Sequence, residues 1–186
     1  MAAEPLAGSD AGGRSSPLAT EVRAGRSRWL LFGGLAATVA VVDQIVKAII
    51  VANFEVERVV PVIGEYARIV VSHNSGALFG MFRDQAPIFA FFSFLVIGVI
   101  VWYQSRAGGS LLLTLALGLL LGGAIGNLTD RLRLGYVVDF VDLGIGTWRF
   151  YTFNVADMAI SGSILLLLLL AVLPQRSAWL GEAPDA

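Results

Sequence analysis

The sequence contains no cysteine and a single histidine, His73, and only 15% of its 186 residues are charged. The lack of cysteine excludes disulfides, thiolate metal sites, cysteine nucleophiles and a lipidated cysteine on this chain. A single histidine excludes a multi-histidine metal centre and argues against a zinc enzyme. The net charge is −1 and there is no run of basic residues, so nucleic acid is not an expected partner.

Apolar side chains are in excess: they make up 56% of the chain and give a mean hydropathy of +0.76. Soluble domains are usually about 45–50% apolar and about 25% charged. Disorder over most of the chain is also excluded, because disorder needs low hydrophobicity and high charge. The composition therefore predicts a small integral membrane protein.

Four apolar stretches follow one another along the chain, at residues 29–52, 86–103, 110–125 and 158–173. A helix that spans a membrane needs about 20 residues, and the third and fourth stretches fall short of that length. Extending them to about 20 residues brings Asn127 and Asp157 inside the spans. We expect an all-α integral membrane protein with four transmembrane helices whose polar ends lie at the membrane surface.

Three segments are expected, a disordered cytoplasmic tail, a four-helix membrane domain and a second cytoplasmic tail, at residues 1–28, 29–173 and 174–186. Arg23, Arg26 and Arg28 crowd the start of the first span, and positive charge next to a span favours the cytoplasmic side. Both termini are therefore expected in the cytoplasm, with outer loops at residues 53–85 and 126–157.

The first outer loop contains two short runs rich in β-branched residues, 58–63 and 67–71, with a turn between them. Such residues favour strands. We expect a small extracytoplasmic β-element on the outer membrane surface, which is either a plain hairpin or a cradle for substrate.

Polar residues gather at the outward ends of the expected spans. They are Asp43, Gln44, Lys47, Asn74, Ser75, Asn127, Thr129, Asp130, Arg131, Asp139, Asp142, Asn154 and Asp157. Ionisable groups at membrane depth are costly and rare, so they are candidates for function.

Two of these groups have both a structural and a functional interpretation. Asp43 and Lys47 are four residues apart and face the same side of a helix, so they either form an ion pair or bind a substrate carbonyl or headgroup. Asn74 either donates to a peptide backbone or caps the turn that follows it. The sequence does not choose between these alternatives.

The end of the third span combines small and charged residues. Gly122, Gly123 and Gly126 are expected to allow close packing between helices. Packing does not explain the neighbouring Asp130 and Arg131, which are expected to form a local ion pair.

Asn154 is a plausible N-cap for the fourth helix, and the helix dipole favours Asp157 in its first turn. A structural cap explains Asp157 but leaves Asp139 as a lone carboxylate among apolar neighbours. Two aspartates from different segments near a membrane surface suggest an aspartyl protease dyad, in which one carboxyl keeps its proton. Spacing alone leaves Asp130 and Asp142 as equal candidates.

Five short motifs occur in this order, Asp43-Gln-x-x-Lys47, Asn74-x-Gly-Ala-x-Phe79, Gly126-Asn-Leu-x-Asp-Arg131, Val137-Val-Asp-Phe140 and Phe153-Asn-x-Ala-Asp157. Together they resemble the lipoprotein signal peptidase family (signal peptidase II). The resemblance implies an aspartyl endopeptidase of the bacterial inner membrane, with its active site near the outer surface. It would remove the signal peptide of prolipoproteins just before a diacylglyceryl-modified cysteine.

The resemblance also implies residue roles, with Asp139 and Asp157 as the catalytic aspartates. The residues implied to support catalysis or to bind substrate are Asp43, Lys47, Asn74, Gly76, Asn127, Asp130, Arg131 and Asn154. No metal or organic cofactor is implied, and the partners are prolipoproteins, membrane lipids and the cyclic peptide inhibitor globomycin. A monomer suffices because both aspartates come from one chain. One departure is Leu78, which stands where the family often has alanine.

Two other classes of function compete with a peptidase. A small transporter or proton channel could use Asp43, Asp139 and Asp157 as relay carboxylates. A relay would spread its carboxylates through the membrane depth, whereas these gather at one end. A structural membrane subunit without chemistry is the third alternative, and it predicts that Asp139→Asn is silent.

Overall fold

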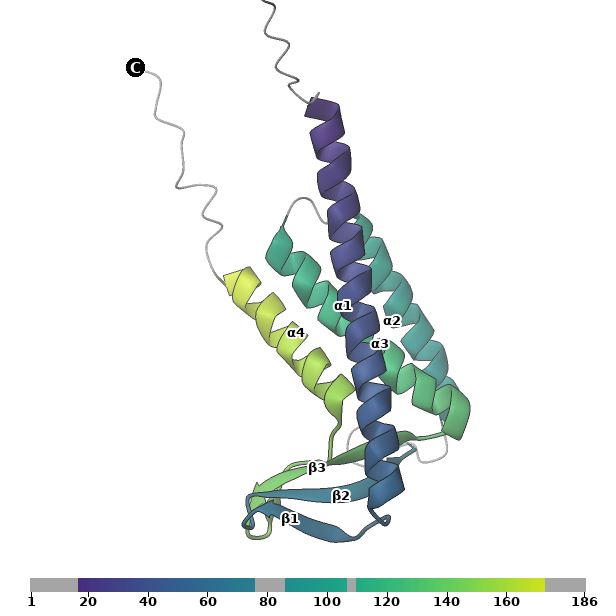
Figure 1. Cartoon of the computed structure of the whole chain (residues 1–186), viewed down its shortest axis with the longest axis vertical. Helices are drawn as coiled ribbons and strands as arrows, with labels where there is room; N and C mark the ends of the chain where they lie inside the picture. Colours follow the sequence, from purple (N-terminus) through teal and green to yellow (C-terminus); the bar gives the residue numbers. More distant parts are fainter. Residues whose placement is uncertain (1–16, 76–85, 107–109, 173–186) are drawn as a thin grey trace, which may run out of the picture.

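The computed structural model describes residues 17–75, 86–106 and 110–172. Its helices are α1 (Pro17–Asn53), α2 (Ala86–Arg106), α3 (Leu111–Leu134) and α4 (Val155–Val172). Its strands are β1 (Val59–Ile63), β2 (Ala67–Asn74), β3 (Val137–Ile145) and β4 (Trp148–Arg149). The helices form a bundle and the strands form a small sheet at one end of it (Figure 1).

Each of the four helices is long and apolar enough to cross a membrane, with a mean hydropathy between 2.0 and 2.3 over its most apolar window. α3 packs against α1, α2 and α4. It is the central helix, because 61% of its most apolar 18-residue stretch is buried, against 11% to 22% of the corresponding stretch in the other three helices. The predicted fold class is confirmed: an α-helical membrane bundle with a small β-element.

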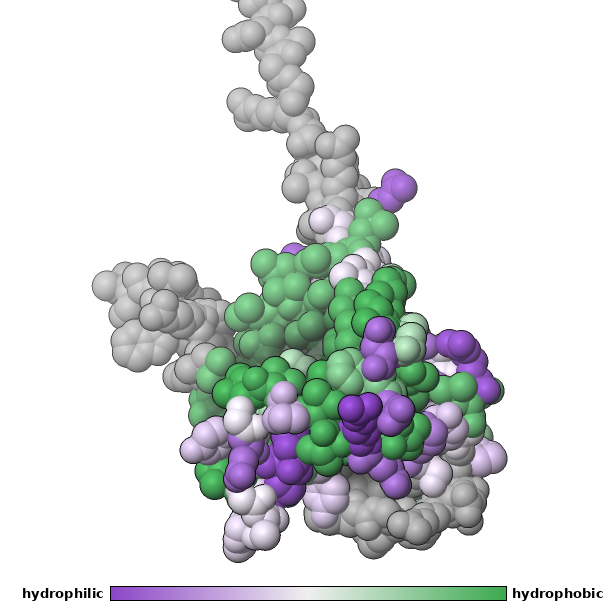
Figure 2. All heavy atoms as spheres, turned by 60° about the horizontal axis from the view of Figure 1, so that its bottom comes forward, coloured by the Kyte–Doolittle hydropathy of each residue, from purple (hydrophilic) through white to green (hydrophobic). Residues whose placement is uncertain are grey.

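Hydrophilic and apolar side chains separate along the bundle. In a view from the sheet end, hydrophilic side chains gather around the sheet and apolar side chains cover the helices behind it (Figure 2). Many large apolar side chains on the helices are exposed, among them Ile45, Phe91 and Leu165. An apolar outer surface of this kind is what a bilayer solvates.

The helices extend further than their apolar stretches. The composition led us to expect a disordered tail up to residue 28, but α1 is helical from Pro17. The helix begins this early because the leucine, alanine and arginine that follow Pro17 are good helix formers. α3 continues past Ile125 to Leu134 and ends at Gly135, which has a left-handed backbone with φ of 79°. Glycine adopts this conformation without strain, and its N–H donates to the carbonyl of Arg131.

Small residues on α3 bring its neighbours into close contact, as the sequence predicted. A Cβ on Gly122 would lie 2.6 Å from Cβ of Val39 on α1. A Cβ on Gly123 would lie 2.5 Å from the carbonyl oxygen of Ala156 on α4. Because no side chain fits in either place, α3 approaches both helices at backbone distance.

The sheet is antiparallel with strand order β1-β2-β3-β4. The two strands predicted in the first loop correspond to β1 and β2, and β2 continues to Asn74. β3 and β4 were not predicted, since the sequence analysis assigned no strands to the second outer loop. Val71, Val138 and Phe140 of the sheet form a buried cluster with Ile50 of α1, which attaches the sheet to the end of the bundle.

Candidate active site

The side chain of one asparagine, Asn154, forms hydrogen bonds with both Asp139 and Asp157. Asp139 lies on β3, Asp157 lies in the first turn of α4, and Asn154 directly precedes that helix. Nδ2 of Asn154 donates to Oδ1 of Asp139 at 2.7 Å. Oδ1 of Asn154 accepts from the backbone N–H of Asp157 at 2.9 Å. The side chain of Asn154 therefore sets the position of one aspartate against the other.

Asn154 is also the predicted N-cap, and the cap is reciprocal. Oδ2 of Asp157 accepts from the backbone N–H of Asn154 at 3.1 Å. Such a pairing between the cap residue and the third helical residue is a capping box, here with aspartate as the acid. The cap prediction is confirmed. The carboxylate of Asp157 thus forms the cap and is also part of the polar cluster that surrounds Asp139.

Asn127 on α3 connects this pair to α1. Its Nδ2 donates to Oδ1 of Asp157 at 2.8 Å. Its Oδ1 accepts from Nδ2 of Asn154 at 3.1 Å and from Nζ of Lys47 at 3.2 Å. Asn127 is 7% exposed, and Asn154 is fully buried. The amide groups therefore form a continuous buried network between α1, α3 and α4.

Lys47 lies at the centre of a buried charge cluster. Its Nζ lies 2.8 Å from Oδ2 of Asp43 and 2.8 Å from Oδ2 of Asp130, in addition to its bond to Asn127. An ammonium group has three donors, and each has an acceptor here. Of the two alternatives for Asp43 and Lys47, the structure contains the ion pair.

The carboxylates of this cluster also organise the backbone around the site. Oδ1 of Asp43 accepts from the N–H of Ala156, at the beginning of α4, at 2.9 Å. Oδ2 of Asp130 accepts from the N–H of Val138 on β3 at 3.1 Å. The first contact places the residue next to Asp157, and the second places the residue next to Asp139. The cluster therefore positions both candidate catalytic aspartates through their neighbours.

The expected ion pair between Asp130 and Arg131 is not among the contacts of the described residues, and Asp130 pairs with Lys47 instead. The expectation was wrong because adjacent residues on a helix do not face each other. The guanidinium of Arg131 lies 5.8 Å from the ring centroid of Phe89 on α2. The charges of Asp157 and Asp139 both act on it, so Arg131 places a cation near the pair.

Asn74 reaches Asp139 from β2, where its Nδ2 donates to Oδ2 of Asp139 at 3.0 Å. The register between β2 and β3 pairs Ile69 with Val141 but Ser72 with Asp139, so β2 contains one extra residue. This bulge was not predicted. Gly76 and Leu78 from the same sequence motif lie outside the described residues.

The environment of Asp139 raises its pKa to about 7. Burial is the largest cause, followed by the charge of Asp157. Hydrogen bonds from Asn74 and Asn154 and the charge of Lys47 oppose the rise. A carboxyl group with a pKa near neutrality can both take up and release a proton at physiological pH.

Asp142 lies on the same strand, but two arginines bind it. Nε of Arg68 donates to its Oδ2 at 2.7 Å, and Nε of Arg149 donates to its Oδ1 at 3.0 Å. Burial alone would raise the pKa of Asp142, but these hydrogen bonds and charges outweigh it and lower the pKa. The sequence left four aspartates as candidates for the dyad. Two of them, Asp142 and Asp130, have cationic partners, which makes them weaker candidates.

Gln44 is the contributor whose role the sequence did not reveal, although it lies inside the first motif. Its Nε2 donates to Oδ1 of Asp130 at 2.8 Å and to the carbonyl of Gly126 at 3.2 Å. Its place among the polar candidates and in the motif with Asp43 and Lys47 singled it out without giving it a role. Among the described residues, no group of three histidine, cysteine, aspartate or glutamate side chains is placed to hold a metal ion.

Residues 35–173 match the model of the signal peptidase (SPase) II family. This chain belongs to that family. It is similar to the lipoprotein signal peptidase of Moorella thermoacetica, with 43% identity over 141 residues that cover 75% of this chain and 91% of the relative. The lipoprotein signal peptidase of Halothermothrix orenii is 37% identical over 133 residues, which cover 71% of this chain and 89% of the relative.

A solved bacterial membrane enzyme, determined at 2.3 Å, has a similar fold. The TM-score is 0.71 at 26% identity, and the match covers 82% of this chain and 92% of that structure. Together with the four apolar helices, the family and the fold identify a multi-pass membrane protein of a peptidase family.

Proposed function

We propose that this protein is an aspartyl lipoprotein signal peptidase that cuts prolipoproteins just before a diacylglyceryl-modified cysteine. The observation that carries the proposal is the placement of Asp139 and Asp157. The two carboxylates come from different elements, are joined through Asn154, and lie where the helices meet the sheet. Membership of the signal peptidase II family supplies the substrate class.

The chemistry needs one carboxylate and one carboxylic acid. The ionised group takes a proton from water, and the water oxygen then attacks the scissile carbonyl carbon. The protonated group donates a hydrogen bond that polarises the scissile carbonyl. When the C–N bond breaks, one of the two protons then held by the pair passes to the leaving amine, and the pair returns to one proton. The raised pKa of Asp139 supports this division, because it keeps one proton in the pair near neutral pH. The pair titrates as a unit, so neither role is assigned to one residue.

The amide network suits this role because it holds the two carboxylates without neutralising them. Asn74 and Asn154 donate to Asp139, and Asn127 donates to Asp157. The ammonium of Lys47 contacts Asp43, Asp130 and Asn127 instead of the two aspartates. Arg131 and Gly76 are expected to bind substrate or to support catalysis.

The location of the site fits a lipid-anchored substrate, whose scissile bond lies at the membrane surface. We infer that the protein spans the bacterial inner membrane, with both termini in the cytoplasm and the sheet on the outer surface. We also expect it to act as a monomer and to bind globomycin at the same site. Both aspartates belong to one chain, so the chemistry needs no second copy.

The test is cleavage of a diacylglyceryl-modified prolipoprotein peptide by the purified protein in detergent, with a chelator present. We expect the wild type to cleave, and Asp139→Asn and Asp157→Asn to lose activity by a factor of at least about 100. Asp142→Asn is the matched control, because it removes a carboxylate from the same strand as Asp139. Thermal unfolding of each variant shows whether it is folded.

Three outcomes would contradict the proposal. Cleavage by both dyad variants would move the chemistry to other residues. Loss of activity on adding the chelator would imply a metal in the reaction. A folded wild type that cleaves no lipid-modified peptide would favour the transporter alternative.

A further inference from the structure

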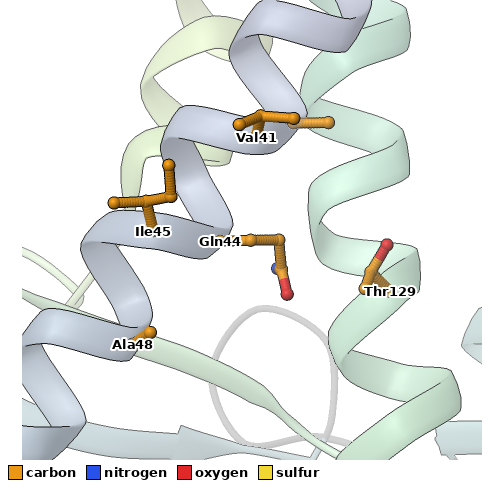
Figure 3. A pocket seen from close by; sticks show the side chains of 6 residues that line it. Val41, Gln44, Ile45, Ala48 and Thr129 are labelled. Carbon is orange, nitrogen blue, oxygen red and sulfur yellow. The ribbon is translucent and has the colours of Figure 1, made fainter.

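A groove of about 410 Å³ runs along the contact between α1 and α3. Its lining residues are Ala40, Val41, Gln44, Ile45, Ala48 and Thr129 (Figure 3). Val41 and Ile45 are 55% and 53% exposed and belong to the first candidate span. The groove is therefore open toward the bilayer rather than enclosed in the bundle.

The polar part of the groove is formed by Gln44 and Thr129, which point toward each other across the two helices (Figure 3). Thr129 donates from Oγ1 to the carbonyl of Ile125 on its own helix at 2.8 Å. Oε1 of Gln44 accepts from Arg133 on α3 at 3.1 Å. An exposed guanidinium is thereby held beside an apolar groove.

Arg133 has no carboxylate within ion-pair distance in the part of the chain that the structure describes. It lies one residue before the end of α3, at Leu134, and so at the depth where lipid headgroups meet the span. A guanidinium has five donors and suits phosphate geometry well. An anionic phospholipid has two parts that fit here. Its headgroup suits a cation at this depth, and its acyl chain suits the apolar groove beside it.

We propose that this groove binds a bilayer phospholipid with an anionic headgroup. One acyl chain lies along Val41, Ile45 and Ala48, and Arg133 binds the headgroup phosphate. From Ala40 to Ala48 the groove follows α1 for about 12 Å at 1.5 Å per residue, the length of part of an acyl chain. The lipid is a bilayer component that stays bound, not the prolipoprotein substrate.

The separation of the groove from the dyad supports this choice of ligand. The hydrogen bonds that lead from Gln44 to Asp157 pass through Asp130, Lys47 and Asn127. These residues are buried, so the charge cluster stands between the groove and the catalytic aspartates. A lipid in the groove can therefore remain while a substrate enters and leaves the dyad.

The test measures lipid retention by native mass spectrometry of the full-length protein in detergent. The protein is incubated with equimolar dioleoyl phosphatidylglycerol and dioleoyl phosphatidylcholine. We expect the wild type to retain phosphatidylglycerol over phosphatidylcholine by about fivefold, the factor that one cation supplies at an anionic membrane surface. Arg133→Gln should reduce this ratio to about one. Ala48→Phe should fill the groove from an exposed position and reduce retention of both lipids.

The matched control is Arg58→Gln, an exposed arginine at the sheet end of the bundle that pairs with Glu55. It should keep the wild-type ratio. Equal ratios in the wild type and Arg133→Gln would overturn the proposal. An equal loss in Arg58→Gln would also overturn it, because the preference would then come from diffuse charge. Lipid retention is read without cleavage, so this result is independent of the proposed peptidase activity.

Discussion

Asn74 on β2 donates to Oδ2 of Asp139 on β3 only because β2 contains a bulge between Ile69 and Ser72. If the pairing of Ile69 with Val141 continued without the extra residue, Asn74 would pair with Tyr136 and face away from Asp139. With the bulge, Asn74 pairs with Val137 and shares a face with Asp139. One inserted residue thus brings a donor to the dyad.

Replacing Asn74 with leucine removes a hydrogen bond that lowers the pKa of Asp139. The pKa of Asp139 should therefore rise above about 7. If activity needs one proton in the dyad, the alkaline limb of the pH profile of kcat/KM should move to higher pH. The control is His73→Gln, since His73 lies on the other face of β2 and stacks on Tyr136. An unchanged alkaline limb in Asn74→Leu would contradict the assignment.

The raised pKa of Asp139 also predicts how stability depends on pH. The folded state holds the proton more tightly than the unfolded state, whose pKa is near 3.8. The stabilising effect is complete below that value and is lost as pH rises through about 7. Thermal unfolding of the wild type should therefore shift downward between pH 4 and pH 8, relative to Asp139→Asn. Parallel curves for the two proteins would show that Asp139 does not titrate in this range.

Gly126→Ala should disturb the buried charge cluster. Its Cβ would lie 2.8 Å from Oδ2 of Asp43, the atom that pairs with Lys47. Displacing that carboxylate should cost about 1–3 kcal/mol of stability and should weaken its contact with the N–H of Ala156. Gly98→Ala on α2 is the control, because a Cβ there meets nothing within 4 Å. That variant should be neutral or stabilised by up to about 1 kcal/mol.

Asp142→Asn should lower stability but leave the chemistry intact. Asp142 is 4% exposed, and its carboxylate binds Arg68 and Arg149, which would both lose an anionic partner. Both arginines remain partly exposed, so we expect a loss of about 1–2 kcal/mol, less than for a fully buried pair. Because the pKa of Asp142 is lowered, its contribution is present above its usual value and lost as the pH falls through the lower one. The difference in Tm between the two proteins should shrink under acid, while kcat at neutral pH stays the same.

The sequence determined the features that depend on neighbouring residues. Apolar stretches predicted the four helices, because a span is defined by its length and hydropathy. The cap formed by Asn154 and Asp157 follows from a helical spacing of three residues. The ion pair between Asp43 and Lys47 is one of the two alternatives that a spacing of four residues allowed, and both residues lie within about one helical turn of each other.

Only the tertiary structure decided the contacts between distant segments. The carboxylate of Asp43 reaches the N–H of Ala156 across 113 residues, and Asp130 pairs with Lys47 instead of its neighbour in the chain. The side of β2 that carries Asn74 depends on a bulge, and a shift of one residue reverses every side chain beyond it. Such contacts depend on how helices pack and how strands align. These are properties of the whole chain, and local spacing does not encode them.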